Sequence, residues 1–306
     1  MITVLFATHN GENTLPVMLD NFCKLEAPKN DWEIIAVDNA SNDNTAAIIK
    51  SYIDRLPITY IYEAQAGKNN ALNIGLTVAK GELVVLTDDD IIPQSTWLTQ
   101  WENCTNSHPD YAVFGGRIQA KWPRQPEKWI LDYAPLSISY GITPCDAQEG
   151  ETEPYSVWGA NMVIRKKIFD QGFRFNNGVG PNGMNYVMGS ETEFTARLYQ
   201  EGFKPWFCNK AIVQHIIREH QLSKDWLIKR AFRYGRSLYM DEFKTFDKNL
   251  PLIYGVPRWK FRGFISTYIK YIMSFLSFNN KNKFQSAWEI SSLRGYVSEA
   301  LNQRNI

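Results

Sequence analysis

The sequence is poor in cysteine, and its cysteines are not arranged as a metal or disulfide framework. Four are present, far apart and without a CxxC pair: Cys23, Cys104, Cys145 and Cys208. This spacing argues against a zinc knuckle and against a secreted disulfide scaffold. We therefore expect four reduced thiols in a cytoplasmic protein.

Other short motifs and segments are also absent. No GxGxxG follows the first predicted strand and no GxxxxGK[ST] occurs, so neither a dinucleotide fold nor a P-loop is supported. The chain enters an apolar segment at residue 2 without a basic leader or a run of signal-peptide length, and we expect no export signal. Residues 263–278 are apolar but too few to span a membrane, which takes about 20.

The sequence does contain ample material for a core. Its 306 residues are 44% hydrophobic and 14% aromatic, enough for one large α/β domain with an appendage. The net charge of +1 hides an asymmetry, because residues 224–306 hold 15 Lys and Arg against 6 Asp and Glu, leaving 18 against 26 in residues 1–223. A basic tail on an acidic body suggests that the tail meets an anionic surface, either membrane lipid or nucleic acid.

Strand and helix patterns alternate through the first 90 residues. Buried-strand patterns cover residues 2–7, 33–37, 58–62 and 82–87, and helical patterns follow the first three at residues 14–25, 46–55 and 71–78. This alternation predicts parallel pairing with right-handed crossovers, so polar residues collect at the carboxyl ends of the strands. The residues that fall there are Thr8 to Asn10, Asp38 with Asn39, and Asp88 to Asp90.

Three consecutive carboxylates, Asp88, Asp89 and Asp90, end the fourth strand. They would repel one another unless a cation neutralises them, and oxygen ligands suit hard cations such as Mg²⁺ or Mn²⁺. Lys68, at a glycine-led turn on the same rim, could supply a second positive charge for phosphates. Two plainer interpretations stay open: the acids form a solvated turn that caps a helix beginning near Pro93, and Lys68 is an ordinary exposed lysine.

A series of motifs follows along residues 1–220: Thr8-His9-Asn10, Val37-Asp38-Asn39-Ala40-Ser41, Gly67-Lys68-Asn69-Asn70-Ala71-Leu72-Asn73-Ile74-Gly75, Asp88-Asp89-Asp90, Val157-Trp158-Gly159-Ala160-Asn161, Gly189-Ser190-Glu191-Thr192-Glu193-Phe194-Thr195-Ala196-Arg197-Leu198, and His215. In this order they resemble family 2 glycosyltransferases of the GT-A fold. The resemblance implies an α/β fold with a Rossmann-like, mainly parallel sheet flanked by helices. It also implies a nucleotide-sugar donor, a divalent cation and inversion at the anomeric carbon by direct displacement.

The resemblance assigns roles to particular residues. The nucleotide-sugar donor would contact a set at the strand ends: Thr8, His9, Asn10, Glu12, Asp38, Asn39, Lys68, Asp88 and Asp89. Asp90 and His215 would hold the cation, Mn²⁺ or Mg²⁺, and imidazole suits Mn²⁺ better. Trp158 and Asn161 would lie on the acceptor side. Asn39 stands where many relatives have a second Asp near the base, which leaves uridine, thymidine and guanosine donors open.

Residues 188–202 carry the start and stop signals of a helix. Ser190 at the N-cap forms a capping box with Glu193, which also has a partner in Arg197 four residues on. Glu191 has no such local partner and is predicted to be exposed at the helix start. The resemblance makes Glu191 the catalytic base, although Ser190 and Glu191 replace the usual Glu-Asp pair of the family and lengthen the carboxylate side chain by one methylene.

The middle of the chain is less regular. Residues 111–118 predict a further strand, and residues 122–140, rich in Trp, Tyr and Pro, predict a loop across one face of the sheet. Three aromatic residues of this loop are candidates to line a sugar or lipid path: Trp122, Trp129 and Tyr133. The alternative is that they cover a core.

The basic tail predicts two helices, at residues 225–239 and 263–278. The second has a wide apolar face between basic flanks, which suits a helix lying in a membrane interface; the flanking residues are Arg258, Lys260, Arg262, Lys281 and Lys283. Docking on the body or on a second subunit is the alternative. We divide the chain into a GT-A domain, residues 1–222, with a nucleotide-sugar half (1–118) and an acceptor half (119–222), and a helical extension, residues 223–306.

The resemblance favours an inverting, hexosyltransferase-type enzyme that moves a sugar from a UDP-, dTDP- or GDP-sugar to a hydroxyl acceptor, lipid-linked or glycan, in cell-surface polysaccharide or glycolipid synthesis. It would act as a peripheral protein on the cytoplasmic face of the membrane. A nucleotidyltransferase is a rival, but its glycine- and arginine-rich amino-terminal loop is absent. A nucleotide-sugar-binding module with an impaired base is the rival without catalysis. Nucleic-acid binding fits the apolar residues 264–276 less well than lipid does, and the oligomeric state stays open.

Overall fold

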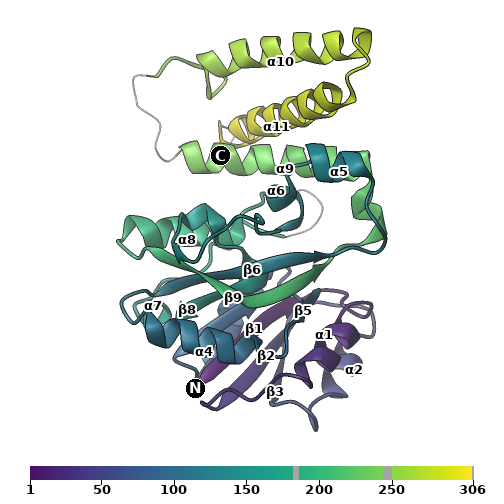
Figure 1. The fold of residues 1–306 in the computed structure, drawn as a ribbon. Helices are drawn as coiled ribbons and strands as arrows, with labels where there is room; N and C mark the ends of the chain where they lie inside the picture. The colour runs from purple at the N-terminus through teal and green to yellow at the C-terminus, as the bar shows by residue number, and fades with distance from the viewer. Residues whose placement is uncertain (182–185, 244–249, 305–306) are drawn as a thin grey trace. The chain divides into compact units, whose positions relative to one another are not determined.

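The computed structural model describes residues 1–181, 186–243 and 250–304. The chain forms two compact units (Figure 1). The sheet unit comprises Met1–Lys121, Tyr140–Met184 and Ser190–Ile216. The helical unit comprises Trp122–Ser139, Asn185–Gly189 and Ile217–Ile306. Residues 122–139 therefore belong with the C-terminal helices, and the predicted division at residue 222 stays a proposal.

Parallel strands form the first half of the sheet unit, in the order β3-β2-β1-β4. The apolar runs of β1, β2 and β4 are buried, as expected for strands covered on both faces. The elements are β1 (Ile2–Thr8), α1 (Leu15–Phe22), β2 (Trp32–Asn39), α2 (Thr45–Lys50), β3 (Ile58–Glu63), α3 (Lys68–Val78) and β4 (Leu83–Thr87). The strand and helix order predicted for this half is confirmed.

The sheet continues beyond β4 in the order β8-β6-β9-β5, with β7 pairing with β9, which gives nine strands within the described residues. β8 runs antiparallel to both neighbours, while β6 and β9 are parallel to each other. The elements are β5 (Ile91–Pro93), α4 (Trp97–Ser107), β6 (Val113–Lys121), β7 (Gly150–Glu151), η1 (Pro154–Ser156), η2 (Gly159–Asn161), β8 (Met162–Arg165), α7 (Lys166–Asp170), α8 (Ser190–Gln200) and β9 (Pro205–Ile216). A mainly parallel sheet flanked by helices confirms the predicted fold class.

Two apolar clusters, one on each face of the sheet, form the core of this unit. Successive residues of β1 alternate between them, since Val4 belongs to one cluster and Leu5 to the other. α1 and α4 cover the first cluster, in which Trp97 is fully buried, and α3 and α8 cover the second, in which Phe194 is fully buried. With both faces covered, the carboxyl ends of the strands form the open rim where such folds bind ligands.

Residues 91–93 form strand β5, which corrects the prediction of a helix beginning near Pro93. β9 is 12 residues long and offers an edge to which β5 pairs antiparallel, with Ile91 opposite His215 and Pro93 opposite Val213. Proline is tolerated in an edge strand because its missing N–H is not needed there. α4 begins only at Trp97, so the acid triplet leads into a strand and does not cap a helix.

Residues 122–140 are not a plain loop, which is a second correction. They contain α5 (Lys128–Tyr133) and α6 (Leu136–Tyr140). The Trp129 ring packs against Phe284 with the ring centroids 5.2 Å apart, and the Lys224 ammonium lies 5.2 Å from its centre. Trp129 therefore covers a core of the helical unit, as the alternative interpretation proposed.

Three long helices and a hairpin form the rest of the helical unit: η3 (Glu219–Leu222), α9 (Lys224–Phe243), β10 (Leu252–Ile253), β11 (Val256–Pro257), α10 (Arg258–Leu276) and α11 (Asn280–Arg304). α11 lies between α9 and α10 (Figure 1). α9 and α11 cross at two glycines, because Gly235 meets the backbone of Ser292 and Gly295 meets that of Phe232; a Cβ at either glycine would overlap with the facing helix. Within the described residues, every helix is too short or too polar to cross a bilayer.

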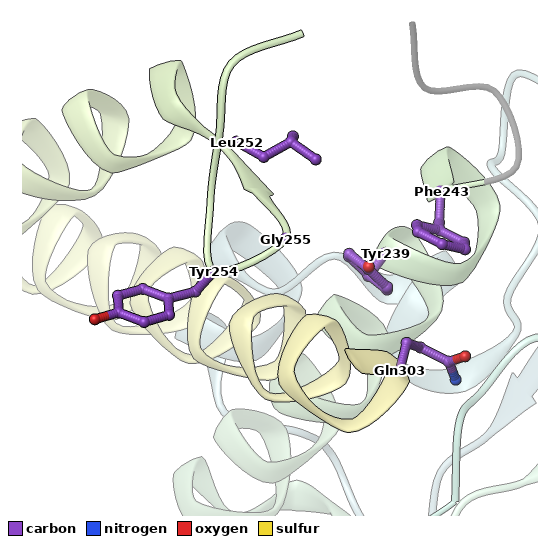
Figure 2. A pocket seen from close by; sticks show the side chains of 6 residues that line it. All are labelled: Tyr239, Phe243, Leu252, Tyr254, Gly255 and Gln303. Atoms are coloured by element: carbon purple, nitrogen blue, oxygen red, sulfur yellow. The ribbon is translucent and has the colours of Figure 1, made fainter. Parts of the chain in front are cut away.

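The β10–β11 hairpin turns through Tyr254 and Gly255. Both have positive φ, 52° and 77°, as a type I′ turn requires. The turn borders a pocket of about 350 Å³ that is lined by Tyr239, Phe243, Leu252, Tyr254, Gly255 and Gln303 (Figure 2). The predicted site residues lie elsewhere, at the strand ends of the sheet unit, so we do not assign this pocket to the functional site.

Cys104 of α4 and Cys208 of β9 form a disulfide, which corrects the expectation of four reduced thiols. The two residues are 104 positions apart in sequence, and only the packing of α4 near β9 brings their Cα atoms to 6.3 Å. Spacing along the chain could not reveal this pair. Cys23 and Cys145 are free. The cysteines therefore no longer support the prediction that the protein resides in a reducing compartment.

We expect two thiols, not four, to react with a chromogenic thiol reagent in the denatured, unreduced protein, because Cys104 and Cys208 are bonded. Reduction should lower the free energy of unfolding by about 2–4 kcal/mol, since a cross-link over a long loop restricts the unfolded chain. Guanidinium titrations with and without reductant measure this change. Cys23→Ser is the matched control and should leave the effect of reduction intact. Four reactive thiols would show that the pair is reduced in solution.

Candidate active site

The polar residues after β1, β2 and β4 meet at one rim of the sheet, as predicted. The strand register places Thr8 beside Asp38 and Phe6 beside Thr87, so the three strands end together. The Thr8 hydroxyl is buried and donates a hydrogen bond to the carboxylate of Asp89. Thr8 thus holds the acid triplet in place against the first strand.

The loop after β1 is joined to the loop after β2 by several hydrogen bonds. His9 Nδ1 lies 2.7 Å from the Asn39 carbonyl oxygen, and the Asn10 backbone N–H donates to Ser41 Oγ at 2.9 Å. The Glu12 carboxylate accepts a hydrogen bond from the Asn44 amide at 3.1 Å. His9 and Asn10 remain exposed on the rim, where they can contact a ligand, while Glu12 helps to fix the loop.

Asp38 and Asn39 are both buried. Asp38 accepts hydrogen bonds from the Tyr60 hydroxyl at 2.9 Å and from the Ser41 backbone N–H at 3.1 Å. Burial and the contact with Asp38 raise the pKa of Tyr60 to about 12. Tyr60 was not predicted as a site residue, because only its position in the strand next to Asp38 could have indicated a contact with the site.

The Asn39 side chain is hydrogen-bonded inside the protein. Its amide N–H groups donate to the carbonyl oxygens of Glu63 at 3.2 Å and Gln65 at 2.8 Å, and its oxygen accepts the Gly67 backbone N–H at 2.7 Å. These bonds fix the turn that precedes Lys68. A contact of Asn39 with the donor stays a prediction.

Lys68 stands at the first turn of α3 and joins two acids from distant parts of the chain. Its Nζ lies 2.5 Å from Asp88 Oδ1 and 2.5 Å from Glu191 Oε1. Burial alone would lower the pKa of Lys68, but the attraction of the Asp88 and Glu191 charges outweighs it and raises that pKa above its usual value. Lys68 is not an ordinary exposed lysine, since only 17% of its side chain is accessible.

Glu191 is largely buried and paired with Lys68, which corrects the prediction of an exposed acid without a partner. Only 16% of its side chain is accessible. The side chain lies against Gly159 of η2, where an added Cβ would overlap with the carboxylate. Gly159, in the motif at residues 157–161, thus leaves room for the side chain of Glu191, in a later motif. This role of Gly159 was not predicted from the sequence.

The helix around Glu191 begins differently from the prediction. α8 starts at Ser190 itself, whose hydroxyl donates to the Asn69 side-chain oxygen, so Ser190 is the first residue of the helix and contacts α3. The Glu193–Arg197 pair is confirmed, with Arg197 Nε 2.9 Å from Glu193 Oε1. Glu193 is buried and engaged within its own helix, so of the two acids only Glu191 reaches the lysine at the rim.

Asp90 and His215 converge from β5 and β9. His215 Nε2 lies 3.3 Å from Asp90 Oδ1, and the ring Nδ1 lies 2.6 Å from the Tyr140 carbonyl oxygen. Burial would lower the pKa of His215, but the charge of Asp90, the hydrogen bonds to Asp90 and Tyr140 and the charge of Asp88 raise it to about 9. The Asp90 carboxylate and the His215 imidazole thus lie next to each other, and both are partly accessible to solvent.

This pair fits the cation that the resemblance implies. Tyr140 fixes the ring by accepting from Nδ1, which leaves Nε2 as a ligand atom beside the Asp90 carboxylate. Among residues 1–181, 186–243 and 250–304, no group of three or more His, Cys, Asp or Glu residues is placed to hold a metal ion. Two protein ligands are enough for a Mg²⁺-type site only where substrate phosphates and water complete the coordination.

The two predicted acceptor-side residues have different environments. Asn161 is fully buried, and its place on the acceptor side stays a prediction. Its oxygen accepts from Trp97 Nε1 at 2.9 Å, and its amide donates to the carbonyl oxygens of Arg117 and Ala211. Asn161 therefore ties α4, β6 and β9 together. Trp158 is partly exposed beside Gly159 and stays a candidate for the acceptor side.

A mainly parallel sheet with acids, a lysine and a histidine on one rim is the architecture of the GT-A class of glycosyltransferase folds. Solved structures share the fold: mannosyltransferase PcManGT from Pyrobaculum calidifontis, in complex with GDP-Man and Mn²⁺, has a TM-score of 0.59 at 17% identity, over 99% of this chain and 74% of that one. S. aureus TarS 1–349 in complex with UDP-GlcNAc has a TM-score of 0.55 at 16% identity, over 99% and 91%. The chain belongs to glycosyl transferase family 2, whose sequence profile matches residues 3–173.

Relatives of established name support the same family. The chain is 26% identical over 200 residues to the glucosyl-dolichyl phosphate glucuronosyltransferase of Haloferax volcanii, which covers 61% of this chain and 62% of the relative. It is 24% identical over 245 residues to a Methanococcus voltae dolichyl N-acetyl-alpha-D-glucosaminyl phosphate 3-beta-D-2,3-diacetamido-2,3-dideoxy-beta-D-glucuronosyltransferase, over 76% and 71%. The chain thus spans less than two thirds of the first relative's length. The family profile ends before Glu191 and His215, so their roles depend on the geometry.

Proposed function

We propose that this chain is an inverting, metal-dependent glycosyltransferase that moves a sugar from a nucleotide-sugar donor to a hydroxyl acceptor. One observation carries the proposal: Lys68 bridges Asp88 and Glu191 on the rim. The bridge brings together a donor-side acid (Asp88), an ammonium group suited to bind phosphate (Lys68) and a carboxylate suited to act as a base (Glu191). Membership of family 2 supports the reaction class.

The donor would lie along the rim formed by the loops after β1, β2 and β4. Exposed His9 and Asn10 are available to the nucleoside, and Asp88 and Asp89 to the ribose or sugar. Asp90 and His215 would hold a divalent cation, which supplies positive charge to the diphosphate as it leaves. Lys68 adds a second positive charge at the same side.

Glu191 would act on the acceptor. Its carboxylate takes the proton of the acceptor hydroxyl while the hydroxyl oxygen forms a bond to the anomeric carbon of the donor sugar. The bond from that carbon to the diphosphate oxygen breaks, and its electron pair stays on the diphosphate.

The substrate class is proposed from the relatives. Several carry names that specify dolichyl phosphate or poly(ribitol-phosphate) substrates, which supports a lipid-linked or polymeric acceptor in glycolipid or cell-surface polysaccharide synthesis. A lipid-linked acceptor would place the enzyme at a membrane surface as a peripheral protein. The neighbours with GDP-Man and UDP-GlcNAc support a nucleotide-sugar donor and leave its base open. The cytoplasmic side stays a prediction, and the oligomeric state stays open.

The rival is a nucleotide-sugar-binding module with an impaired base. The glutamate at position 191, in place of the family's aspartate, was the feature in its favour. The room over Gly159 weakens this alternative, because the longer side chain of Glu191 is accommodated beside Lys68 rather than pushed away from the rim.

Incubation with a panel of UDP-, dTDP- and GDP-sugars tests the proposal. We expect slow hydrolysis of one donor or a few related donors with Mn²⁺, measured as released nucleoside diphosphate, and its loss on chelation, because the leaving diphosphate needs the cation. Calorimetric titration with each donor is the matched binding assay. Binding without hydrolysis or transfer would favour the binding module, and absence of both would contradict the proposed function.

A further inference from the structure

α10 turns its polar side inward and its apolar side outward. The residues that it buries are Thr267 and Ser274, with 8% and 2% of their surfaces exposed, and Thr267 donates a hydrogen bond to Glu289 of α11 at 3.0 Å. Large apolar side chains on the rest of the helix are 47–70% exposed; we call them the apolar face of α10: Ile265, Ile269, Ile272, Met273, Phe275 and Leu276. A helix of a soluble protein normally packs such a face into its core.

Exposed apolar side chains also flank α10 in the sequence at both ends. Phe278, directly after the helix, is 90% exposed. Leu252, Ile253 and Tyr254 of the β10–β11 hairpin, which directly precedes the helix, are exposed as well. An uncovered apolar surface of this extent marks a binding surface rather than a scatter of single exposed side chains.

Basic residues predominate in the segment that carries this surface. Residues 250–288 contain six Lys and Arg and no Asp or Glu. Lys260 is directed inward and paired with Glu242 at 2.9 Å, but Arg258, Arg262, Lys270 and Lys281 are exposed. A broad apolar face with a mainly basic border complements the anionic headgroups and acyl chains of a bilayer.

The same charges disfavour a second copy of this chain as the covering partner. Pairing two copies through α10 would bring one mainly basic border against another, and the resulting repulsion opposes association. An anionic lipid surface meets the same border with attraction. From the inverted packing and the charge border together, we infer that α10 lies in the interfacial layer of an anionic bilayer, with its apolar face inserted among the acyl chains.

Vesicle co-sedimentation of the full chain tests this inference. We expect at least about tenfold tighter binding to vesicles of equal parts phosphatidylglycerol and phosphatidylcholine than to phosphatidylcholine alone, and weaker binding at high salt, because ions screen the headgroup attraction. The variant Ile265→Ser/Ile269→Ser/Ile272→Ser should lose about 10- to 100-fold of the binding to anionic vesicles, since insertion depends on buried apolar area. Arg262→Glu/Lys270→Glu should abolish the preference for phosphatidylglycerol.

The matched control is Ile53→Ser/Val78→Ser, which removes exposed apolar side chains from the sheet unit and should leave vesicle binding unchanged. All variants change exposed positions, so we expect them to fold. Melting temperatures equal to that of the wild type verify this. Wild-type protein that stays in the supernatant at low salt would overturn the inference. So would a wild-type dimer that the triple serine variant dissociates in the absence of lipid, or a triple variant that binds vesicles like wild type.

The inference extends the proposed membrane-side acceptor but does not depend on catalysis. Donor hydrolysis in the absence of vesicles should be the same in the triple serine variant as in wild type, because α10 contains none of the proposed site residues. Vesicle binding without donor turnover would contradict only the proposed function. Donor turnover without vesicle binding would contradict only the role of α10.

Discussion

Glu191→Gln is expected to leave donor binding and melting temperature close to wild type while lowering sugar transfer about 10²–10⁴-fold, the usual contribution of a positioned general base. Glutamine has nearly the same shape, so it keeps its place over Gly159 and can still accept a hydrogen bond from Lys68. A neutral amide cannot take the proton of the acceptor hydroxyl. Initial rates of transfer, calorimetric titration with donor and thermal melts measure the three quantities.

Glu193→Gln is the matched control, two residues along the same helix. It removes the partner of Arg197 inside α8 and should cost about 1 kcal/mol of stability, with transfer per folded molecule close to wild type. If Glu191→Gln transfers sugar at nearly the wild-type rate while Glu193→Gln is folded and inactive, the roles of the two acids are the reverse of those proposed.

Asp90→Asn should abolish the dependence of donor binding on Mn²⁺ and lower transfer at least about 100-fold. The proposed site has two protein ligands, so an amide in place of the carboxylate removes half of the set and its negative charge. Changes to residues that merely support a metal ligand already cost about 10–100-fold in metal affinity. Donor titrations with Mn²⁺ and with chelator give the difference directly.

The variant Asp88→Asn distinguishes the contribution of the metal site from that of the rest of the rim. It loses the ion pair with Lys68 rather than a metal ligand, so we expect weaker donor binding that still responds to Mn²⁺. Undiminished donor affinity of Asp90→Asn at saturating Mn²⁺ would contradict the assignment of Asp90 as a ligand.

The parts of the site that follow from local pattern were predictable. Each predicted strand of the first half carries its polar residues at its carboxyl end, and parallel pairing leaves no other place for them than a shared rim. This is why Thr8, Asp38 and Asp88 could be grouped from the sequence. The order of motifs then identified the family before any contact was known.

Contacts between distant segments were not predictable, because no local pattern records them. Lys68 and Glu191 are 123 residues apart, so Glu191 looked unpartnered in its own helix. Asn161 belongs to a motif of the family, yet its side chain fills a buried position between three elements. The pairing of β5 with β9 similarly overrode the helix start expected near Pro93, because this pairing joins segments more than 100 residues apart in sequence.

The two glycines at which α9 and α11 cross also fix an orientation. Since the backbones mesh at Gly235 and again at Gly295, α11 cannot roll about its axis or slide by a residue without forcing atoms into each other. α10 is attached to α11 through its polar side, by Thr267 and Glu289, so it inherits that rotational setting. Two side-chain-free positions on α9 and α11 therefore set the direction in which the apolar face of α10 points.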